Sequence, residues 1–134
     1  MTRTIKFSGD YDWSHQPGGG SHRPYSEVRV FGPSRYRRVV CILDSGADHL
    51  QLPEEILDDI GIIHDPEDGF ETVLDASLCN VNFKVFKDVE VEIEGNKITV
   101  ETVLSLPGVP ALLGRTAFLS AIDVGFDDDG WLYK

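Results

Sequence analysis

Residues 41–56, CILDSGADHLQLPEEI, begin as an apolar run and change abruptly to Asp-Ser-Gly-Ala-Asp. A carboxylate at the end of a buried strand is costly unless it is paired, hydrogen-bonded or used in chemistry. Asp44 therefore either caps the turn before a following helix, with no catalysis, or carries a function. Sequence patterns elsewhere in the chain are needed to decide between these two roles.

The apolar run is predicted to be the second strand of a β-hairpin. Residues 26–31 and 38–43 flank a Gly32-Pro33-Ser34 turn, which is the pattern of such a hairpin. Because residues 39–43 are apolar throughout, we expect that strand to be buried on both faces. Residues 53–61 have a proline near the start, acids in the first turn and a glycine past the end, which predicts a short helix.

From residue 83 onward the apolar residues recur with a period of two. Valine and isoleucine at 89, 91 and 93 alternate with glutamates, and Gly95-Asn96 is expected to turn the chain into a second strand. This pattern predicts a hairpin with one acidic face. Further strands are expected at 122–126 and 131–133, and one or two helical turns at 116–121. The predicted fold class is mainly β with one or two short helices.

Length, charge and cysteine content limit the structural and functional classes to which this protein can belong. The 134 residues suit one domain, 1–134, and a formal net charge of −11 would repel a nucleic-acid backbone. No apolar stretch approaches the ~18 residues of a membrane span, and the first residues lack the apolar block of a signal peptide, so we expect a cytoplasmic protein with no membrane partner. Cys41 and Cys79 are too few for a disulfide framework and are expected to be reduced thiols.

A long loop is expected at 10–25, after a first short strand at 3–7, because it is rich in Gly, Pro, Ser and His without periodicity. His15 and His22 within it could ligate a metal together, but no cysteine or third histidine is near, which favours two solvated side chains. Residues 127–130, DDDG, resemble part of a calcium loop and are better explained as an acidic turn. We therefore expect no metal and no cofactor.

Two motifs together resemble the retropepsin-like aspartic peptidases. Asp44-Ser45-Gly46 follows a buried strand and precedes Ala47-Asp48, and ALLGRTAFL at 111–119 is similar to the second signature of that family, in which apolar residues precede Gly-Arg and a short helix. Asp-Ser-Gly alone would be a weak indication, since such triplets occur by chance. Both motifs in this order, ~65 residues apart across a β-rich span, are a much stronger one.

The resemblance implies a retropepsin-like acid protease barrel with one Asp-Ser-Gly half-site per chain. Two carboxylates that share one proton can activate a water and protonate a peptide carbonyl, because they do not readily ionise together at close range. Asp44 would be the catalytic residue, supported by Ser45 and Gly46. Residues 123–125, DVG, lack the hydroxyl of a second half-site, so the partner is expected to be Asp44 of another copy in a homodimer.

The resemblance also assigns roles around the catalytic residue. Ala47 and Asp48 would face the bound peptide, and Asp48 would pair with Arg115. An ion pair between Asp48 and Arg115 that only stabilises the fold is an equally weighted alternative. The terminal segments, 2–7 and 131–133, are candidates for strands that interleave across the dimer.

The family closes a β-hairpin flap over its substrate, and residues 72–85 occupy the corresponding region in this chain. Asp75, Ala76 and Ser77 are the expected tip, although the region contains no glycine. The flap assignment therefore departs from the glycine-rich tip that is common in the family.

The leading hypothesis is a homodimeric aspartic endopeptidase that hydrolyses an extended protein or peptide substrate without metal or covalent intermediate. One alternative is a non-catalytic module of the same fold that binds a peptide or mediates dimerisation. Another is a domain that dimerises transiently and is active only when a partner concentrates it.

Overall fold

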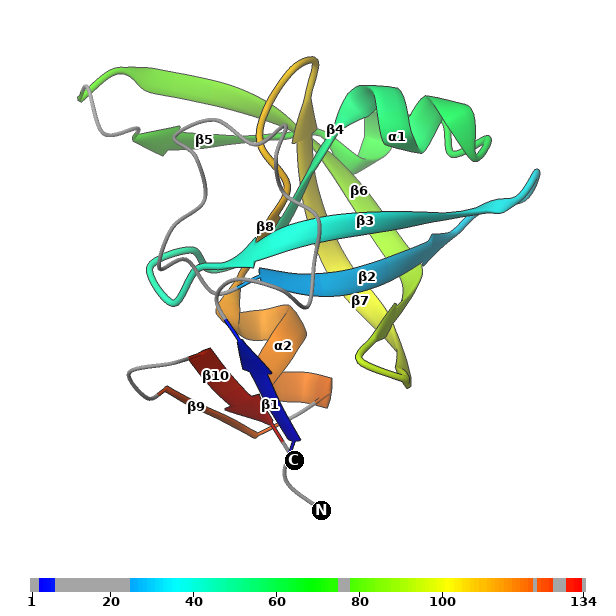
Figure 1. The fold of residues 1–134 in the computed structure, drawn as a ribbon. Coiled ribbons are helices and arrows are strands. Elements are labelled where there is room, and N and C mark those ends of the chain that lie inside the picture. Colours follow the sequence, from blue (N-terminus) through cyan, green and yellow to red (C-terminus); the bar gives the residue numbers. More distant parts are fainter. Residues whose placement is uncertain (1–2, 7–24, 75–77, 122, 127–129, 134) are drawn as a thin grey trace.

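The computed structural model describes residues 3–6, 25–74, 78–121, 123–126 and 130–133. The fold is mainly β with two short α-helices, as the sequence predicted (Figure 1). Its strands are β1 (Arg3–Lys6), β2 (Tyr25–Phe31), β3 (Tyr36–Leu43), β4 (Leu50–Pro53), β5 (Phe70–Leu74), β6 (Asn80–Ile93), β7 (Asn96–Leu106), β8 (Leu112–Leu113), β9 (Val124–Phe126) and β10 (Gly130–Tyr133). The helices are α1 (Glu54–Asp59), the 3-10 helix η1 (Pro66–Asp68) and α2 (Arg115–Ala121).

The larger sheet closes on itself. Its strand order is β2-β3-β8-β4-β7-β6-β5, and β2 also pairs with β6. The first six strands in this order, from β2 through β8 and β7 to β6, therefore form a closed ring. β5 lies outside the ring because it pairs with the first half of β6, which extends beyond the ring. The main hydrophobic core fills the ring and includes side chains from β2, β3, β4, β6, β7 and both α-helices.

The β2–β3 hairpin forms as predicted, with Gly32 N–H donating to the Arg35 carbonyl at 3.0 Å across the turn. The prediction that the second strand is buried on both faces was wrong. Val39, Cys41 and Leu43 are buried, whereas the two residues between them are only half-buried. One face of β3 points into the core of the ring, and the outer face is incompletely covered.

The long β6–β7 hairpin has the predicted alternation, with Val89, Val91 and Ile93 in the core. Its turn lies one residue earlier than predicted, at Glu94 and Gly95, with φ angles of 47° and 85°. Such a pair of positive φ angles suits a two-residue turn whose twist matches the flanking strands. Asn96 already belongs to the ladder, opposite Ile93, so the predicted turn of Gly95-Asn96 is corrected to Glu94-Gly95.

Both predicted helices are present. Pro53 precedes α1, Glu54 and Glu55 lie in its first turn, and Ile56 and Leu57 are buried. Acidic side chains in the first turn interact favourably with the positive end of the helix dipole. Among the described residues, no helix is long and apolar enough to cross a membrane.

The two ends of the chain form a separate three-stranded sheet in the order β1-β10-β9. β1 runs antiparallel to β10, with Arg3 opposite Tyr133 and Lys6 opposite Gly130. The terminal strands that were expected to interleave between two copies thus pair with each other within one chain. Interleaving would have to involve the outer edges of β1 or β9, and it stays a prediction.

Candidate active site

Asp44 lies directly after β3, at the point where β3 ends beside β8. The two strands run parallel, with Leu43 opposite Leu113. The Asp44 amide donates to the Leu113 carbonyl at 3.0 Å, so the first residue past β3 is still tied to the last residue of β8. β8 lies between β3 and β4, the two strands that residues 44–49, named the site loop, connect. The Asp44 carboxylate is therefore carried where three strands converge.

The turn after β3 is organised around the Asp44 side chain. Asp44 Oδ1 accepts a hydrogen bond from Gly46 N–H at 2.9 Å, and Ala47 N–H donates to the Asp44 carbonyl at 3.1 Å. Aspartates commonly stabilise turns in this way. A Cβ at Gly46 would lie 3.2 Å from Oδ1, so glycine keeps space beside the carboxylate. Asp44 is half-buried, and its Oδ2 accepts no hydrogen bond from the described part of the chain.

The second motif packs directly against the site loop. Arg115 N–H donates to the Ala47 carbonyl and Thr116 N–H to the Asp48 carbonyl, each at 3.0 Å, so the first turn of α2 is joined to the loop backbone. Gly114 permits this approach, because a Cβ there would lie 2.3 Å from the His49 carbonyl oxygen. Two segments that are far apart in the sequence thus form one structural unit.

Asp48 and Arg115 are brought together as an ion pair between Asp48 Oδ1 and Arg115 Nη2. Both side chains are largely exposed, 68% for Asp48 and 49% for Arg115. Exposed ion pairs contribute little to stability, so this pair does not by itself explain why the two motifs meet. The contribution of Asp48 to substrate binding stays a prediction.

The remaining predicted site residues differ in how far they are exposed to solvent. Ser45 and Gly46 form the exposed tip of the turn, and Ala47 is half-buried beneath them. The Ser45 hydroxyl has no hydrogen-bond partner among the described residues. Asp123, which was rejected as a second half-site, is exposed and precedes β9 of the separate terminal sheet.

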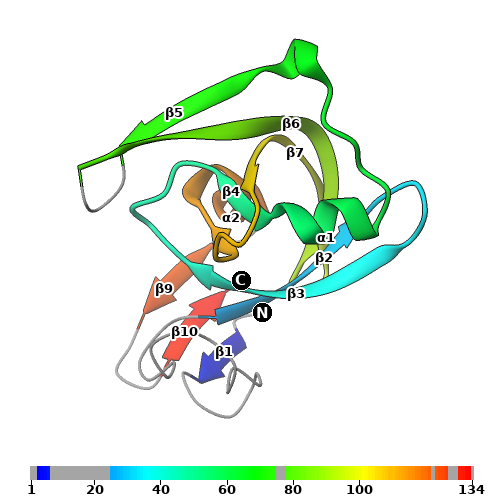
Figure 2. The same cartoon turned by 90° about the horizontal axis from the view of Figure 1, so that it is seen from above.

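The predicted flap corresponds to the antiparallel hairpin of β5 and β6, in which Leu74 faces Asn80. The expected tip residues Asp75, Ala76 and Ser77 fall between these strands and lie outside the described residues. In both ribbon views the outer end of the hairpin and the site loop lie on the same side of the molecule, and the terminal sheet lies beyond the site loop (Figures 1 and 2). The hairpin is thus well placed to cover the site loop.

The base of the hairpin rests on a small second core, the hairpin-base cluster. It comprises buried Phe83, Val85 and Leu104, with Val81, Leu106 and Val109 packed against them. Lys84 of β6 also makes an ion pair with Glu54 at the start of α1. Farther out the hairpin is less covered, because Leu74 and Leu78 are 59% and 79% exposed.

Two side chains that the sequence analysis missed hold the loop at 107–110, which leads into β8. Gln51 Nε2 donates to the Pro110 carbonyl at 3.0 Å, and Glu55 Oε1 accepts from Gly108 N–H at 2.9 Å. Both hydrogen bonds join residues far apart in the sequence, and no local sequence pattern around Gln51 or Glu55 predicts them. The loop that precedes β8 is therefore held from β4 and α1.

The two cysteines differ in their surroundings. Cys41 is fully buried in β3, and this burial raises the pKa of its thiol to about 12. Cys79 is exposed beside the hairpin tip. No cluster of three or more His, Cys, Asp or Glu side chains suitable for a metal ion occurs within the described residues, and His15 and His22 fall outside them.

No protein-family model matches the chain, and no curated protein matches it.

Proposed function

We propose that this protein is an aspartic endopeptidase that acts as a homodimer, with one Asp44 carboxylate from each copy. The observation that carries the proposal is the convergence of the two motifs. Backbone hydrogen bonds from Asp44 to Leu113 and from Arg115 to Ala47 hold the loop that carries the carboxylate. These bonds fix the loop backbone, and the hydrogen bond from Gly46 N–H to Oδ1 orients the carboxylate, as a shared-proton pair requires.

The proposed chemistry needs a second carboxylate at close range. A twofold axis beside the site loop would bring Asp44 of another copy opposite the first, because symmetric dimers place the same residue on both sides of the axis. One carboxylate would accept a proton from the attacking water while the protonated partner donates to the peptide carbonyl oxygen. Among the described residues none donates a hydrogen bond to Asp44 Oδ2, which supports this role because one oxygen is then available to a water.

The position of the hairpin supports an extended peptide as the substrate. Such a peptide would lie between the β5–β6 hairpin and the site loop, where backbone groups can pair with it as with an added strand. The formal net charge of −11 favours approach of basic peptides. In its most specific form, the proposal is that the protein is a cytoplasmic, retropepsin-like peptidase that uses no cofactor.

The alternative is a non-catalytic module of the same fold. It is favoured by the hydrogen bond from Gly46 N–H to Asp44 Oδ1, which an aspartate that only stabilises a turn would also make. In that case the site loop would serve peptide binding or dimerisation, and the carboxylate would do no chemistry.

Cleavage of a diverse peptide library by the wild type and by Asp44→Asn, from about pH 4 to 7, separates these functions. Asparagine retains an oxygen that can accept from Gly46 N–H, so the turn should survive while the proton-transfer group is lost. The proposal predicts cleavage by the wild type and at least about a thousandfold loss in the variant. Peptide binding without cleavage, by a protein that sedimentation shows to be a dimer, would favour the non-catalytic module.

The transient-dimer alternative needs a separate measurement. Sedimentation at several concentrations, with cleavage measured in parallel, shows whether activity follows the dimer fraction. A dimer that persists at nanomolar concentration would exclude an enzyme that depends on a partner to concentrate it.

A further inference from the structure

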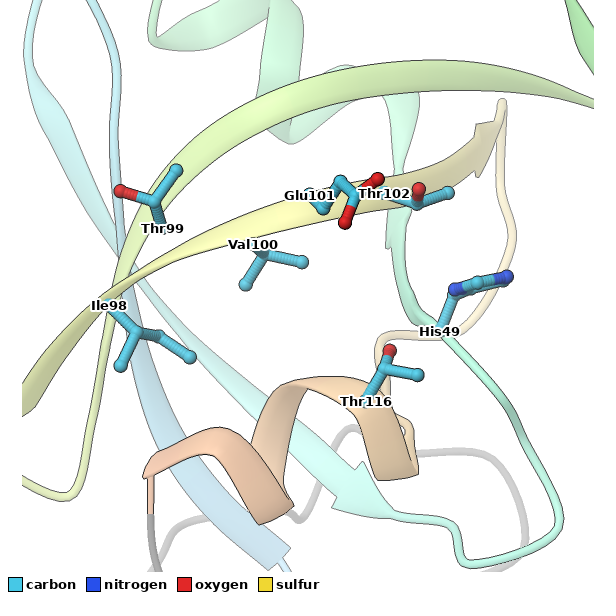
Figure 3. A pocket seen from close by; sticks show the side chains of 7 residues that line it. All are labelled: His49, Ile98, Thr99, Val100, Glu101, Thr102 and Thr116. Carbon is cyan, nitrogen blue, oxygen red and sulfur yellow. The ribbon is translucent and has the colours of Figure 1, made fainter.

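A hollow lies between β7, α2 and the last residue of the site loop, His49, and no step of the proposed peptidase mechanism uses it. Its volume is about 380 Å³, within the range of sites for small ligands or single side chains. It is lined by His49, Ile98, Thr99, Val100, Glu101, Thr102 and Thr116. Figure 3 shows the His49 ring at one end of the hollow, between Thr102 of β7 and Thr116 of α2.

The two ring nitrogens of His49 have different surroundings. Nε2 lies 3.6 Å from Oε2 of Glu71 on β5, and a carboxylate at this position favours the proton on Nε2. Nδ1 is then a hydrogen-bond acceptor, and it is buried with no partner among the described residues. A buried acceptor without a partner costs free energy, which a bound donor would recover.

Two other polar groups of the hollow, from Thr116 and Glu101, are available only as acceptors. The Thr116 hydroxyl donates its hydrogen to the Asp48 carbonyl at 2.6 Å, so in further contacts its oxygen can only accept. The Glu101 carboxylate adds a negative charge to the lining. Of the neighbouring cations, Arg115 is paired with Asp48, and Lys87 donates to Thr102 Oγ1 at 3.2 Å.

We propose that this hollow binds an alkylammonium or alkylguanidinium group, since these ligands carry several donors and a positive charge. The group would donate to His49 Nδ1 and pair with Glu101, while Ile98 and Val100 contact its alkyl chain. Two sources can supply this chemistry, a lysine or arginine side chain of a bound peptide or a free amine. The peptide source rests on the proposed function, because it places a basic side chain of the substrate beside the site loop.

The first test is a titration of the ¹⁵N-labelled protein with n-butylguanidinium and n-butylammonium, followed by amide chemical shifts, with 1-butanol as the neutral probe. We expect saturable shifts at His49, at Val100 to Thr102 and at Thr116 for both cations, and not for the alcohol. Equal shifts with 1-butanol, or no saturable shifts at these amides, would overturn the proposal.

Two variants and a control test the assigned contacts. Glu101→Gln removes a partly exposed charged contact, and His49→Phe removes a hydrogen-bond acceptor. Each should weaken cation binding about fivefold. Glu67→Gln makes the same change in net charge as Glu101→Gln but lies on η1, and it should bind as the wild type does. Equal weakening by Glu101→Gln and Glu67→Gln would show only nonspecific attraction and would overturn the site.

Peptide cleavage distinguishes the two sources. A peptide source predicts enrichment of lysine or arginine at one position relative to the cleaved bond, which Glu101→Gln should remove and Glu67→Gln should leave. Cation binding without such enrichment assigns the hollow to a free amine. Because the titration needs no turnover, a failure of the peptidase proposal would leave this site testable, and a failure of the site would leave cleavage by Asp44 unaffected.

Discussion

The site loop and the β5–β6 hairpin lie on the same side of the molecule and are held in opposite ways. The site loop is fixed through its backbone, by hydrogen bonds to β8 and α2 and by the close approach of Gly114 to His49. The hairpin is held at its base by the hairpin-base cluster, while Leu74 and Leu78 farther out are exposed. In the proposed peptidase, the backbone contacts of the site loop would orient the Asp44 carboxylate, and the outer part of the hairpin would contact the bound peptide.

One cysteine lies close to the site loop in the sequence, and the other lies close to the hairpin tip. The difference between their rates of chemical labelling should be the largest of the effects predicted here. Cys41 leads into the site loop, and with a pKa of about 12 its thiolate fraction at pH 8 is about one in ten thousand. Cys79 is exposed beside the hairpin tip. We expect a disulfide reagent at pH 8 to label Cys79 at least about a thousandfold faster than Cys41. Comparable rates in the folded protein would contradict a tightly packed β3.

Gly114→Ala should destabilise the protein more than any single substitution in the hairpin. The new Cβ would lie 2.3 Å from the His49 carbonyl oxygen, and backbone on both sides would have to shift. We expect a loss of about 3 kcal/mol in the free energy of unfolding, measured by urea denaturation. Gly95→Ala is the control, because its Cβ meets nothing within 4 Å and only its φ of 85°, in the turn of the β6–β7 hairpin, opposes the change, at a cost of about 1 kcal/mol. Equal losses would mean that Gly114 is not a packing constraint.

Phe83→Ala should separate the hairpin from the site loop. Phe83 is buried in the hairpin-base cluster, and its truncation should cost about 2 kcal/mol, less than in the main core because the cluster is small. Amide hydrogen exchange should accelerate in β5 and the outer half of β6 and change little in residues 44–49. Leu74→Ala, at a side chain that is 59% exposed, should alter stability by less than about 0.5 kcal/mol. Uniform acceleration across the chain would show that the two regions unfold together.

Asp48→Asn should have a small effect on stability, below about 1 kcal/mol, because its ion pair with Arg115 is exposed. A double-mutant cycle with Arg115→Gln measures the coupling energy directly. If Asp48 also contacts substrate, its replacement should reduce kcat/KM by more than the stability loss explains. Parallel losses in stability and cleavage would instead assign the pair a purely stabilising role.

Local elements could be predicted from the sequence because their signals are local. The turn between β2 and β3, the proline and acids at α1, and the alternation at Val89, Val91 and Ile93 all lie within a few neighbouring residues. The turn at Glu94-Gly95 was misplaced by one residue because a glutamate with positive φ has no sequence signal. Burial of β3 was overestimated because an apolar run does not reveal how much of its outer face is covered.

The candidate site was predictable only in part. The Asp44 loop and the Gly114-Arg115 motif could be identified as segments, and their packing against each other appears only in the structure. Gln51 and Glu55, which hold the loop at 107–110, and Glu71, which faces His49, act across long sequence separations. Such contacts depend on how the sheet closes, and no spacing along the chain encodes them.

If one Asp44 carboxylate from each of two copies forms the catalytic pair, a dimer that contains one Asp44→Asn chain should be inactive. Wild type and Asp44→Asn would be mixed in varying proportion, under conditions of subunit exchange, and cleavage per total protein measured. Activity should follow the square of the wild-type fraction, so that an equal mixture retains about a quarter of the activity. Activity proportional to the wild-type fraction, about half in the equal mixture, would show that each chain acts alone and would rule out the shared pair.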